Sequence, residues 1–205
     1  KILLMDEPLS NLDAKLRTEM RASLKRLHRD LNATTVYVTH DQIEALTLSD
    51  RVIIMNEGRI MQEGSPYDIY HHPANIFVAE FIGDPGINLF DGKIDNGVIK
   101  CGEIHIPLPN NFTKNKGSLI VGVRPEKIEV SETKKNGWQE VTTGIIQPTG
   151  ANTIIEVKAG ETPITLLQNG FITLPENSKL WINFELDTLS FFDHETQENL
   201  RNNVG

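Results

Sequence analysis

The sequence has one cysteine, few aromatic residues and no long apolar run, and each of these shortages excludes a class of protein. Cys101 is the sole cysteine, so the 205 residues cannot form an internal disulfide, which fits a reducing compartment. No apolar run approaches the roughly 18–20 residues of a membrane-spanning helix. Aromatic residues make up 6% of the chain and the net charge is -8, a poor combination for binding nucleic acid through stacking and charge. The remaining composition, 39% hydrophobic and 23% charged, is typical of one large or two small globular domains.

Strand and helix patterns alternate at the start of the chain. Residues 2–5 are all apolar and predict a strand buried on both faces, as in a parallel sheet. Apolar residues at helical spacing over 13–31 predict a helix with Asp13 as its N-cap. Residues 34–40 predict a second strand, and residues 41–50 a short helix with its acidic residue in the first turn. This order predicts an α/β fold with parallel strands covered by helices.

The chain then carries a hairpin pattern and two short helical patterns. Residues 51–64 predict two strands joined by an Asn-Glu-Gly turn. Residues 65–82 predict two short helices separated at Pro73. Glycine and proline at 83–86 mark a boundary, so we expect a first domain over residues 1–86.

Beyond residue 86 the pattern changes to short strands between turn signals. Nine strand-like runs of this kind are found at 88–94, 97–101, 118–123, 127–130, 140–146, 152–159, 164–167, 179–186 and 189–193. Asn-Gly pairs beginning at Asn96, Asn136 and Asn169 are strong turn signals, and no long helical pattern intervenes. We therefore expect a second domain over residues 87–205 that is all β, an OB-fold-like barrel or two small barrels.

Two carboxylates and a histidine follow the first two predicted strands. Asp6 and Glu7 end the first strand and His40 ends the second, so parallel pairing would bring them to the sheet edge where α/β proteins bind ligands. A carboxylate there can hold Mg²⁺, and its neighbour can deprotonate a water that attacks a phosphoryl group. An Asp-Glu pair alone more often marks a solvated turn, and a lone histidine is usually structural. Their combination with "SNLD" at residues 10–13 is far more specific than any one part.

These motifs resemble those of the ATP-binding subunits of ABC transporters, especially the importer ATPases of the maltose and glycerol-phosphate type. "ILLMDEP" looks like their Walker B strand, "SNLD" like the D-loop and "YVTHD" like the switch-histidine segment. Residues 50–83 are similar to the end of that ATPase domain, and "GVRPEKIEV" and "FFDHETQENL" resemble segments of its TOBE-type regulatory region. The resemblance implies the C-terminal half of a P-loop NTPase domain of α/β class, followed by a regulatory β barrel.

The resemblance also implies roles for individual residues. Asp6 would organise Mg²⁺ through water, and Glu7 would be the catalytic base that polarises the attacking water. His40 would contact the γ-phosphate of ATP, and Ser10 and Asp13 would lie at the interface between two ATPase subunits.

Two motifs of the resembled family are missing. The 205 residues contain neither a G-x-x-x-x-G-K-[ST] phosphate-binding loop nor an LSGGQ-like signature. In the family, ATP lies between the phosphate loop of one subunit and the signature of the other. We therefore expect that the front half of the ATPase is missing, and that the chain neither binds ATP tightly nor hydrolyses it alone.

Several other conspicuous residues have an ordinary structural interpretation. His71 and His72 have no further metal ligands at a suitable spacing, so a pair at a helix end is favoured. We expect a structural role for Cys101, because its place next to a turn in "IKCGEI" does not suggest a lowered thiol pKa. We expect Trp138 and Trp181 in the core of the barrel.

Three functions compete for this sequence. The resemblance implies an energy-coupling ATPase subunit that uses ATP and Mg²⁺, forms a homodimer and acts on transmembrane permease subunits at the cytoplasmic face of the membrane. The tail is closer to sugar and glycerol-phosphate importers than to polyamine, iron or sulfate importers.

The alternative is a non-enzymatic regulatory and dimerisation module whose acidic β region pairs with its twin or binds a cytoplasmic regulatory protein. The basic turn with Arg124 and Lys127 could serve that partner or an anion, although a surface turn is the simpler interpretation. A nucleic-acid-binding barrel is a third possibility, which the acidic charge disfavours.

Overall fold

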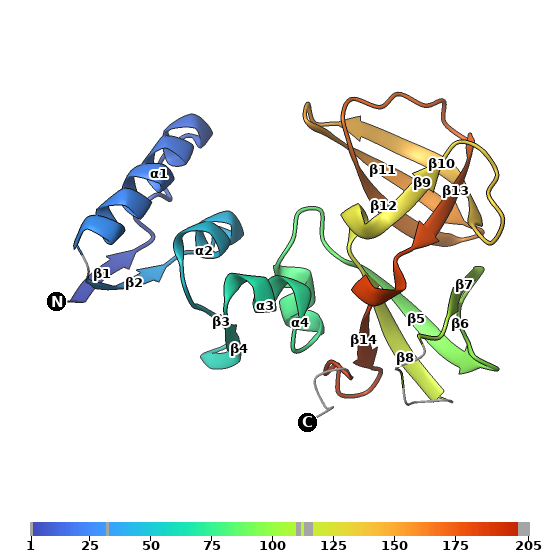
Figure 1. The fold of residues 1–205 in the computed structure, drawn as a ribbon, viewed down its shortest axis with the longest axis horizontal. Coiled ribbons are helices and arrows are strands. Elements are labelled where there is room, and N and C mark those ends of the chain that lie inside the picture. Colours follow the sequence, from blue (N-terminus) through green and yellow to red (C-terminus); the bar gives the residue numbers. More distant parts are fainter. Residues whose placement is uncertain (1, 32, 110–111, 113–116, 201–205) are drawn as a thin grey trace. The chain divides into compact units, whose positions relative to one another are not determined.

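The computed structural model describes residues 2–31, 33–109, 112 and 117–200. Contacts divide the chain into two units, which we call the N-terminal unit (1–70) and the β unit (71–205). Figure 1 shows helices and short strands in the first, and mainly strands in the second. The expected boundary at residue 86 stays a prediction, and the contacts divide the chain after Tyr70.

The N-terminal unit begins with the predicted strand, helix and strand. Strand β1 (Ile2–Asp6) pairs in parallel with β2 (Thr34–Val38), and helix α1 (Ala14–Leu31) connects them. Asp13 caps α1, because its Oδ1 accepts hydrogen bonds from the backbone N–H groups of Lys15 and Leu16. These expectations are therefore confirmed.

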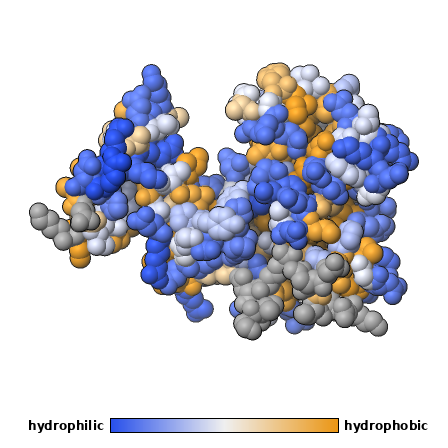
Figure 2. Space-filling model, in the orientation of Figure 1, coloured by the Kyte–Doolittle hydropathy of each residue, from blue (hydrophilic) through white to orange (hydrophobic). Residues whose placement is uncertain are grey.

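The expectation that the first strand is buried on both faces is wrong for this structure. Ile2 and Leu4 are 74% and 73% exposed, and Val36 and Val38 on the paired strand are each about half exposed. Alternate residues along both strands are only half-buried, because the two-stranded sheet is partly covered on one face only. Figure 2 shows apolar side chains, in orange, at the surface of this unit.

Two helices and a hairpin complete the description of this unit. Helix α2 (Gln42–Leu48) begins one residue after Asp41, which acts as its N-cap and does not lie in its first turn as expected. Strands β3 (Val52–Asn56) and β4 (Arg59–Gly64) form the predicted hairpin, followed by α3 (Pro66–His71). Both turn residues, Glu57 and Gly58, have positive φ, as a two-residue hairpin turn of type I′ requires.

The β unit contains helix α4 (Ile76–Phe81) and two five-stranded sheets. One sheet has the order β14-β8-β5-β6-β7 and the other the order β12-β11-β10-β13-β9. The bounds in the first sheet are β5 (Asn88–Asp95), β6 (Val98–Cys101), β7 (Ile104–Pro107), β8 (Gly117–Val123) and β14 (Ser190–Asp193). Those in the second are β9 (Ile128–Ser131), β10 (Gln139–Pro148), β11 (Asn152–Ala159), β12 (Thr162–Asn169) and β13 (Lys179–Phe184). Short 3₁₀ turns lie at Pro125–Lys127 and Leu186–Thr188.

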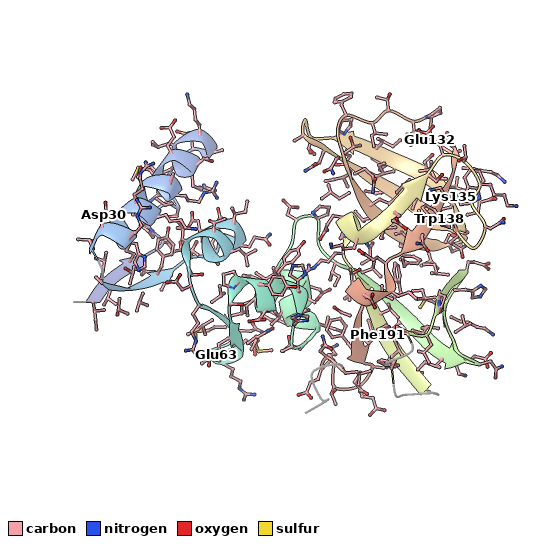
Figure 3. The ribbon with its side chains drawn as sticks, viewed as in Figure 1. Asp30, Glu63, Glu132, Lys135, Trp138 and Phe191 are labelled. Atoms are coloured by element: carbon pink, nitrogen blue, oxygen red, sulfur yellow. The ribbon has the colours of Figure 1, made fainter. Side chains whose placement is uncertain are left out.

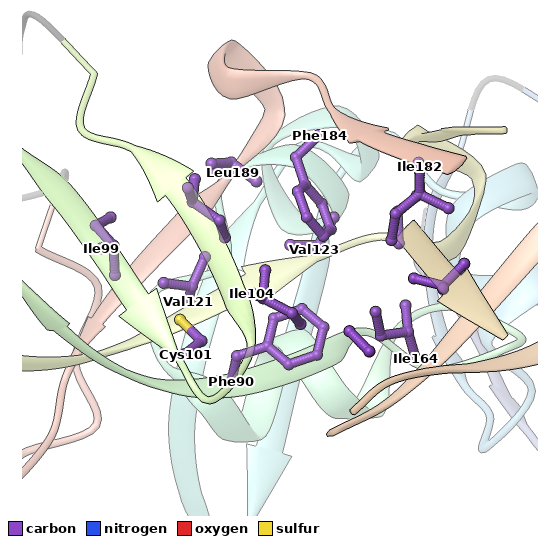
Figure 4. Packing of buried hydrophobic residues seen from close by; sticks show 14 of the residues in the cluster. Phe90, Ile99, Cys101, Ile104, Val121, Val123, Ile164, Ile182, Phe184 and Leu189 are labelled. Carbon is purple, nitrogen blue, oxygen red and sulfur yellow. The ribbon is translucent and has the colours of Figure 1, made fainter. Parts of the chain in front are cut away.

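Both sheets contribute to one apolar core, shown in Figure 4. The side chain of Asn88 also joins the sheets through hydrogen bonds. Its Nδ2 donates to the carbonyl of Thr165 at 2.8 Å and to that of Val123 at 3.2 Å, while its Oδ1 accepts from the N–H of Thr165 at 2.7 Å. One side-chain amide therefore satisfies backbone hydrogen-bonding groups in both sheets.

Helix α4 is fixed to the β unit from two sides. The N–H of Ile76 donates to the carbonyl of Gln197, and Asn199 donates to the carbonyls of Pro73 and Ala74. From the other side, Nη1 of Arg124 donates to the carbonyls of Ala79 and Ile82 at the end of the helix. These hydrogen bonds connect α4, which precedes the sheets in the chain, to the segment that follows them and to Arg124.

Three expectations for the β unit are wrong. Arg124 is 6% exposed and does not lie in a surface turn, because its guanidinium reaches the end of α4. Trp138 and Trp181 are half-buried and do not belong to the core. The Nζ of Lys135 lies 4.0 Å from the ring centre of Trp138, so this ring faces a cation (Figure 3).

Candidate functional site

The ends of β1 and β2 bring the two predicted motifs together. Asp6 pairs in register with Val38, and the N–H of Glu7 donates to the carbonyl of Val38 at 2.8 Å. His40 follows two residues after that carbonyl. The parallel pairing predicted from the sequence therefore places the carboxylates and the histidine at one edge of the sheet.

Glu7 and His40 are in direct contact. The Nδ1 of His40 lies 2.9 Å from Oε1 of Glu7, and their side chains are 71% and 43% exposed. The φ of Glu7 is +43°, an uncommon left-handed value for a residue with a side chain. This conformation ends the alternation of the strand and turns the chain into the residues that follow.

The Glu7 contact changes the acid–base behaviour of the histidine. The hydrogen bond that His40 makes to the carboxylate of Glu7 raises the pKa of His40 above its ordinary value, and the negative charge of Glu7 adds to this effect. Desolvation opposes this rise, and the charges of Asp41 and Glu44 add smaller contributions that raise the same pKa. The pair therefore favours an imidazolium hydrogen-bonded to a carboxylate.

The other three predicted site residues lie in or next to the turn that follows β1. The hydroxyl of Ser10 donates to the carbonyl of Glu7 at 3.0 Å, which closes this turn. Asp13 caps α1, and Asp6 is exposed at the end of β1. Each has a local position consistent with its expected role, and the roles themselves stay predictions.

The fit of the site to Mg²⁺ follows from its carboxylates. Among the residues that the structure describes, no group of three or more His, Cys, Asp or Glu side chains could form a metal cage. Mg²⁺ usually keeps several waters and takes only one or two protein carboxylates together with phosphate oxygens. The exposed carboxylate of Asp6 fits that mode of binding.

A polar network beside the site was missed from the sequence. Glu44 is only 3% exposed, and its Oε2 accepts hydrogen bonds from Tyr37 at 3.0 Å and from Thr39 at 2.7 Å. Burial and the Glu44 hydrogen bond raise the pKa of Tyr37. The available signal was the spacing of Asp41 and Glu44, because an acidic residue three positions after an N-cap is typical of a capping box.

The remaining singled-out residues offer little chemistry. Burial, with a smaller effect of the Asp91 charge, raises the pKa of Cys101 to about 12, so its thiol stays protonated. Burial, with the nearby charge of Lys127, lowers the pKa of His71. No helix in the described part of the chain is long and apolar enough to cross a membrane.

The comparisons find that this chain is similar to ATP-binding subunits of ABC importers. The oligosaccharides import ATP-binding protein MsmX of Bacillus subtilis is 39% identical over 98% of this chain and 58% of its own length. The sn-glycerol-3-phosphate import ATP-binding protein UgpC of Psychromonas ingrahamii is 46% identical over 77% of this chain and 42% of its own. The multiple sugar-binding transport ATP-binding protein MsmK of Streptococcus mutans is 38% identical over 98% of this chain and 59% of its own.

The chain thus spans between two fifths and three fifths of the length of these relatives. The model of the CysA C-terminal regulatory domain matches residues 88–130, within the β unit. The molybdate-bound structure of the cytoplasmic protein ModG covers 51% of the chain with a TM-score of 0.40 and 12% identity, too little similarity to support a conclusion.

Proposed function

We propose that this chain is part of the ATP-hydrolysing subunit of an ABC importer for sugars or glycerol phosphate. The observation that carries the proposal is the contact of Glu7 with His40 at the ends of two parallel strands. On this proposal residues 1–86 are the C-terminal part of a P-loop NTPase domain, and residues 87–205 are an OB-fold-like regulatory domain. The phosphate-binding loop and the signature, absent from these 205 residues, belong to the rest of the subunit.

The chemistry follows from the two oxygens of the Glu7 carboxylate. Oε1 is held by His40, which leaves Oε2 to accept a proton from the water that attacks the γ-phosphorus. The imidazolium form of His40 can donate from Nε2 to a γ-phosphate oxygen and place the phosphate opposite that water. Asp6 would hold Mg²⁺, which neutralises charge on the phosphate oxygens.

The proposed partners follow from the homologues. Two copies would meet at the turn containing Ser10 and Asp13, and the dimer would act on transmembrane permease subunits, which would hold it at the cytoplasmic face of the membrane. Polyamine, iron or sulfate is the alternative cargo.

A regulatory role of the β unit is the second candidate function. It is favoured by the regulatory-domain match at residues 88–130. On this proposal the β unit pairs with a second copy or binds a cytoplasmic regulatory protein, and it performs no chemistry of its own.

ATP hydrolysis by a fusion tests the first proposal. The 205 residues are joined to the remaining sequence of MsmX, which supplies the parts that the chain does not match. We expect hydrolysis by the fusion, little by the 205 residues alone, and a loss of roughly 10²–10⁴-fold in kcat with Glu7→Gln, since the general base is removed. Glu57→Gln, in the exposed turn between β3 and β4, is the matched control and should keep full activity. Undiminished hydrolysis by the Glu7→Gln fusion would refute the assignment of Glu7.

A further inference from the structure

One arginine connects the turn after β1 with the segment after β2. Arg17 lies in the first turns of α1, and its side chain is 32% exposed. Its Nη2 donates to the carbonyl of Leu12 at 3.0 Å, and its Nη1 lies 3.4 Å from Oδ2 of Asp41. Leu12 lies between Ser10 and Asp13, and Asp41 directly follows His40. A single guanidinium therefore contacts both segments of the candidate site.

Asp41 is in turn fixed by its neighbours. Its Oδ1 accepts hydrogen bonds from the N–H groups of Ile43 and Glu44, which cap α2. Its own N–H donates to the hydroxyl of Thr39 at 2.9 Å. Because Asp41 and His40 are consecutive residues, a shift of Asp41 carries the backbone of His40 with it.

One donor of the Arg17 guanidinium makes no hydrogen bond within the described part of the chain. Its Nε is buried and has no partner among the residues that the structure describes. An unsatisfied buried donor is costly and calls for an explanation. The planar fork of the guanidinium supplies one, because it reaches two separate segments at once, which a lysine ammonium would not reproduce.

We propose that Arg17 is a positioning residue, which transmits a displacement of the turn at 10–13 to His40 and so sets the contact of His40 with Glu7. This inference rests on the proposed function, in which that turn meets a second copy. Arrival of the second copy would then regulate the catalytic pair through Arg17, without touching either member of it.

The test measures the pKa of His40 by NMR titration of the 205-residue chain without nucleotide. The direction in which this pKa changes in an Arg17 variant distinguishes a loss of charge from a loss of the Glu7 contact. His40→Gln identifies the signal among the six histidines. Removal of a cation should by charge alone raise the pKa of a nearby imidazole. Loss of the Glu7 contact should lower it, because Glu7 is the main cause of its elevation. Asp41 and Glu44, which also raise this pKa, are retained in every variant.

We expect Arg17→Met to lower the pKa of His40 by at least half of the fall caused by Glu7→Gln. In the Glu7→Gln background the same substitution should cause no fall, because the contact that Arg17 positions is already gone. Arg17→Lys keeps the charge but should also lower the pKa. Arg21→Met, one turn farther along α1, is the matched control and should not lower it.

Two results would overturn the inference. One is an unchanged or raised pKa in both Arg17 variants, and the other is an equal fall with and without Glu7. The pKa measurement needs no ATP hydrolysis, so a failure of the inference and a failure of the proposed function can be told apart. If the double-mutant pattern holds but the MsmX fusion hydrolyses no ATP, the Arg17 link stands and the ATPase proposal fails. If the fusion is active but the pattern is additive, only the inference fails.

Discussion

His40 and Glu7 form an exposed ion pair whose strength depends on pH. Glu7 raises the pKa of His40 in the folded chain, and an unfolded chain has no such contact. A group with a raised folded pKa stabilises the fold below its unfolded pKa, about 6.5 for histidine, and loses that effect as pH rises through the folded value.

The first prediction therefore concerns stability against pH. We expect His40→Gln to lower the urea midpoint of the N-terminal unit at pH 5.5 and to leave it unchanged at pH 9, where the imidazole is neutral in both states. His28→Gln, on α1, serves as the control and should show no such pH dependence. A midpoint difference that is the same at both pH values would contradict the prediction.

A second prediction at the residue scale concerns Arg124. Arg124→Met should destabilise the β unit by roughly 2–4 kcal/mol, because two carbonyls at the end of α4 lose a charged donor in a buried place. Gly83 leaves room for this guanidinium, since a Cβ there would lie 2.6 Å from Nη1. Urea unfolding measures the loss, and Lys127→Met in the same turn is the control, with an expected effect below about 0.5 kcal/mol.

Local sequence patterns predicted the contact between Glu7 and His40 but did not predict the burial of Arg124. The Glu7 and His40 contact follows from strand pairing, because parallel strands bring their carboxyl ends to one edge. The burial of Arg124 depends on carbonyls of Ala79 and Ile82, more than forty positions away. No local pattern carries that information.

At the scale of elements, the sheet of β1 and β2 has an exposed apolar face made by Ile2, Leu4, Val36 and Val38. The sheet has only two strands, so each strand also has an unpaired edge. Exposed apolar faces and open edges favour association between chains. This element is therefore prone to self-association.

The third prediction tests this face. We expect the 205-residue chain to associate with increasing concentration, and Leu4→Lys to shift it toward the monomer, because a lysine on this face opposes edge-to-edge pairing. Ile145→Lys, at a 54% exposed position of β10, is the matched control and should leave association unchanged. Sedimentation velocity distinguishes the cases, and equal association of all three chains would contradict the prediction.

Element types were largely predictable, and the exception is β7. Its residues Ile104 and Ile106 are fully buried, while His105 and Pro107 are exposed, which is the alternation of a half-buried strand. The strand has only four residues and follows the Gly102–Glu103 turn so closely that the pattern was too short to recognise. Its pairing with β6 supplies the evidence that the sequence lacked.

At the scale of the whole molecule, the contacts assign α4 to the β unit, whereas composition alone placed the boundary after it. Hydrogen bonds from Ile76 and Asn199 and the packing of Ile76, Ala79 and Phe192 support the assignment by contacts. The fourth prediction compares two chains, 71–205 and 87–205. We expect the first to unfold in one cooperative transition and the second to be roughly 3–6 kcal/mol less stable, because it loses these bonds and the burial of α4. Equal urea midpoints would favour the boundary at 86.

The burial of Cys101 makes the protein a convenient substrate for site-specific labelling. A thiol that is 2% exposed, with a pKa of about 12, should not react with maleimide at neutral pH. One cysteine introduced at an exposed position of each unit, such as Glu57 and Glu132, would then carry a pair of dyes without removal of the native residue. Fluorescence energy transfer between those dyes would report the distance between the two units in solution.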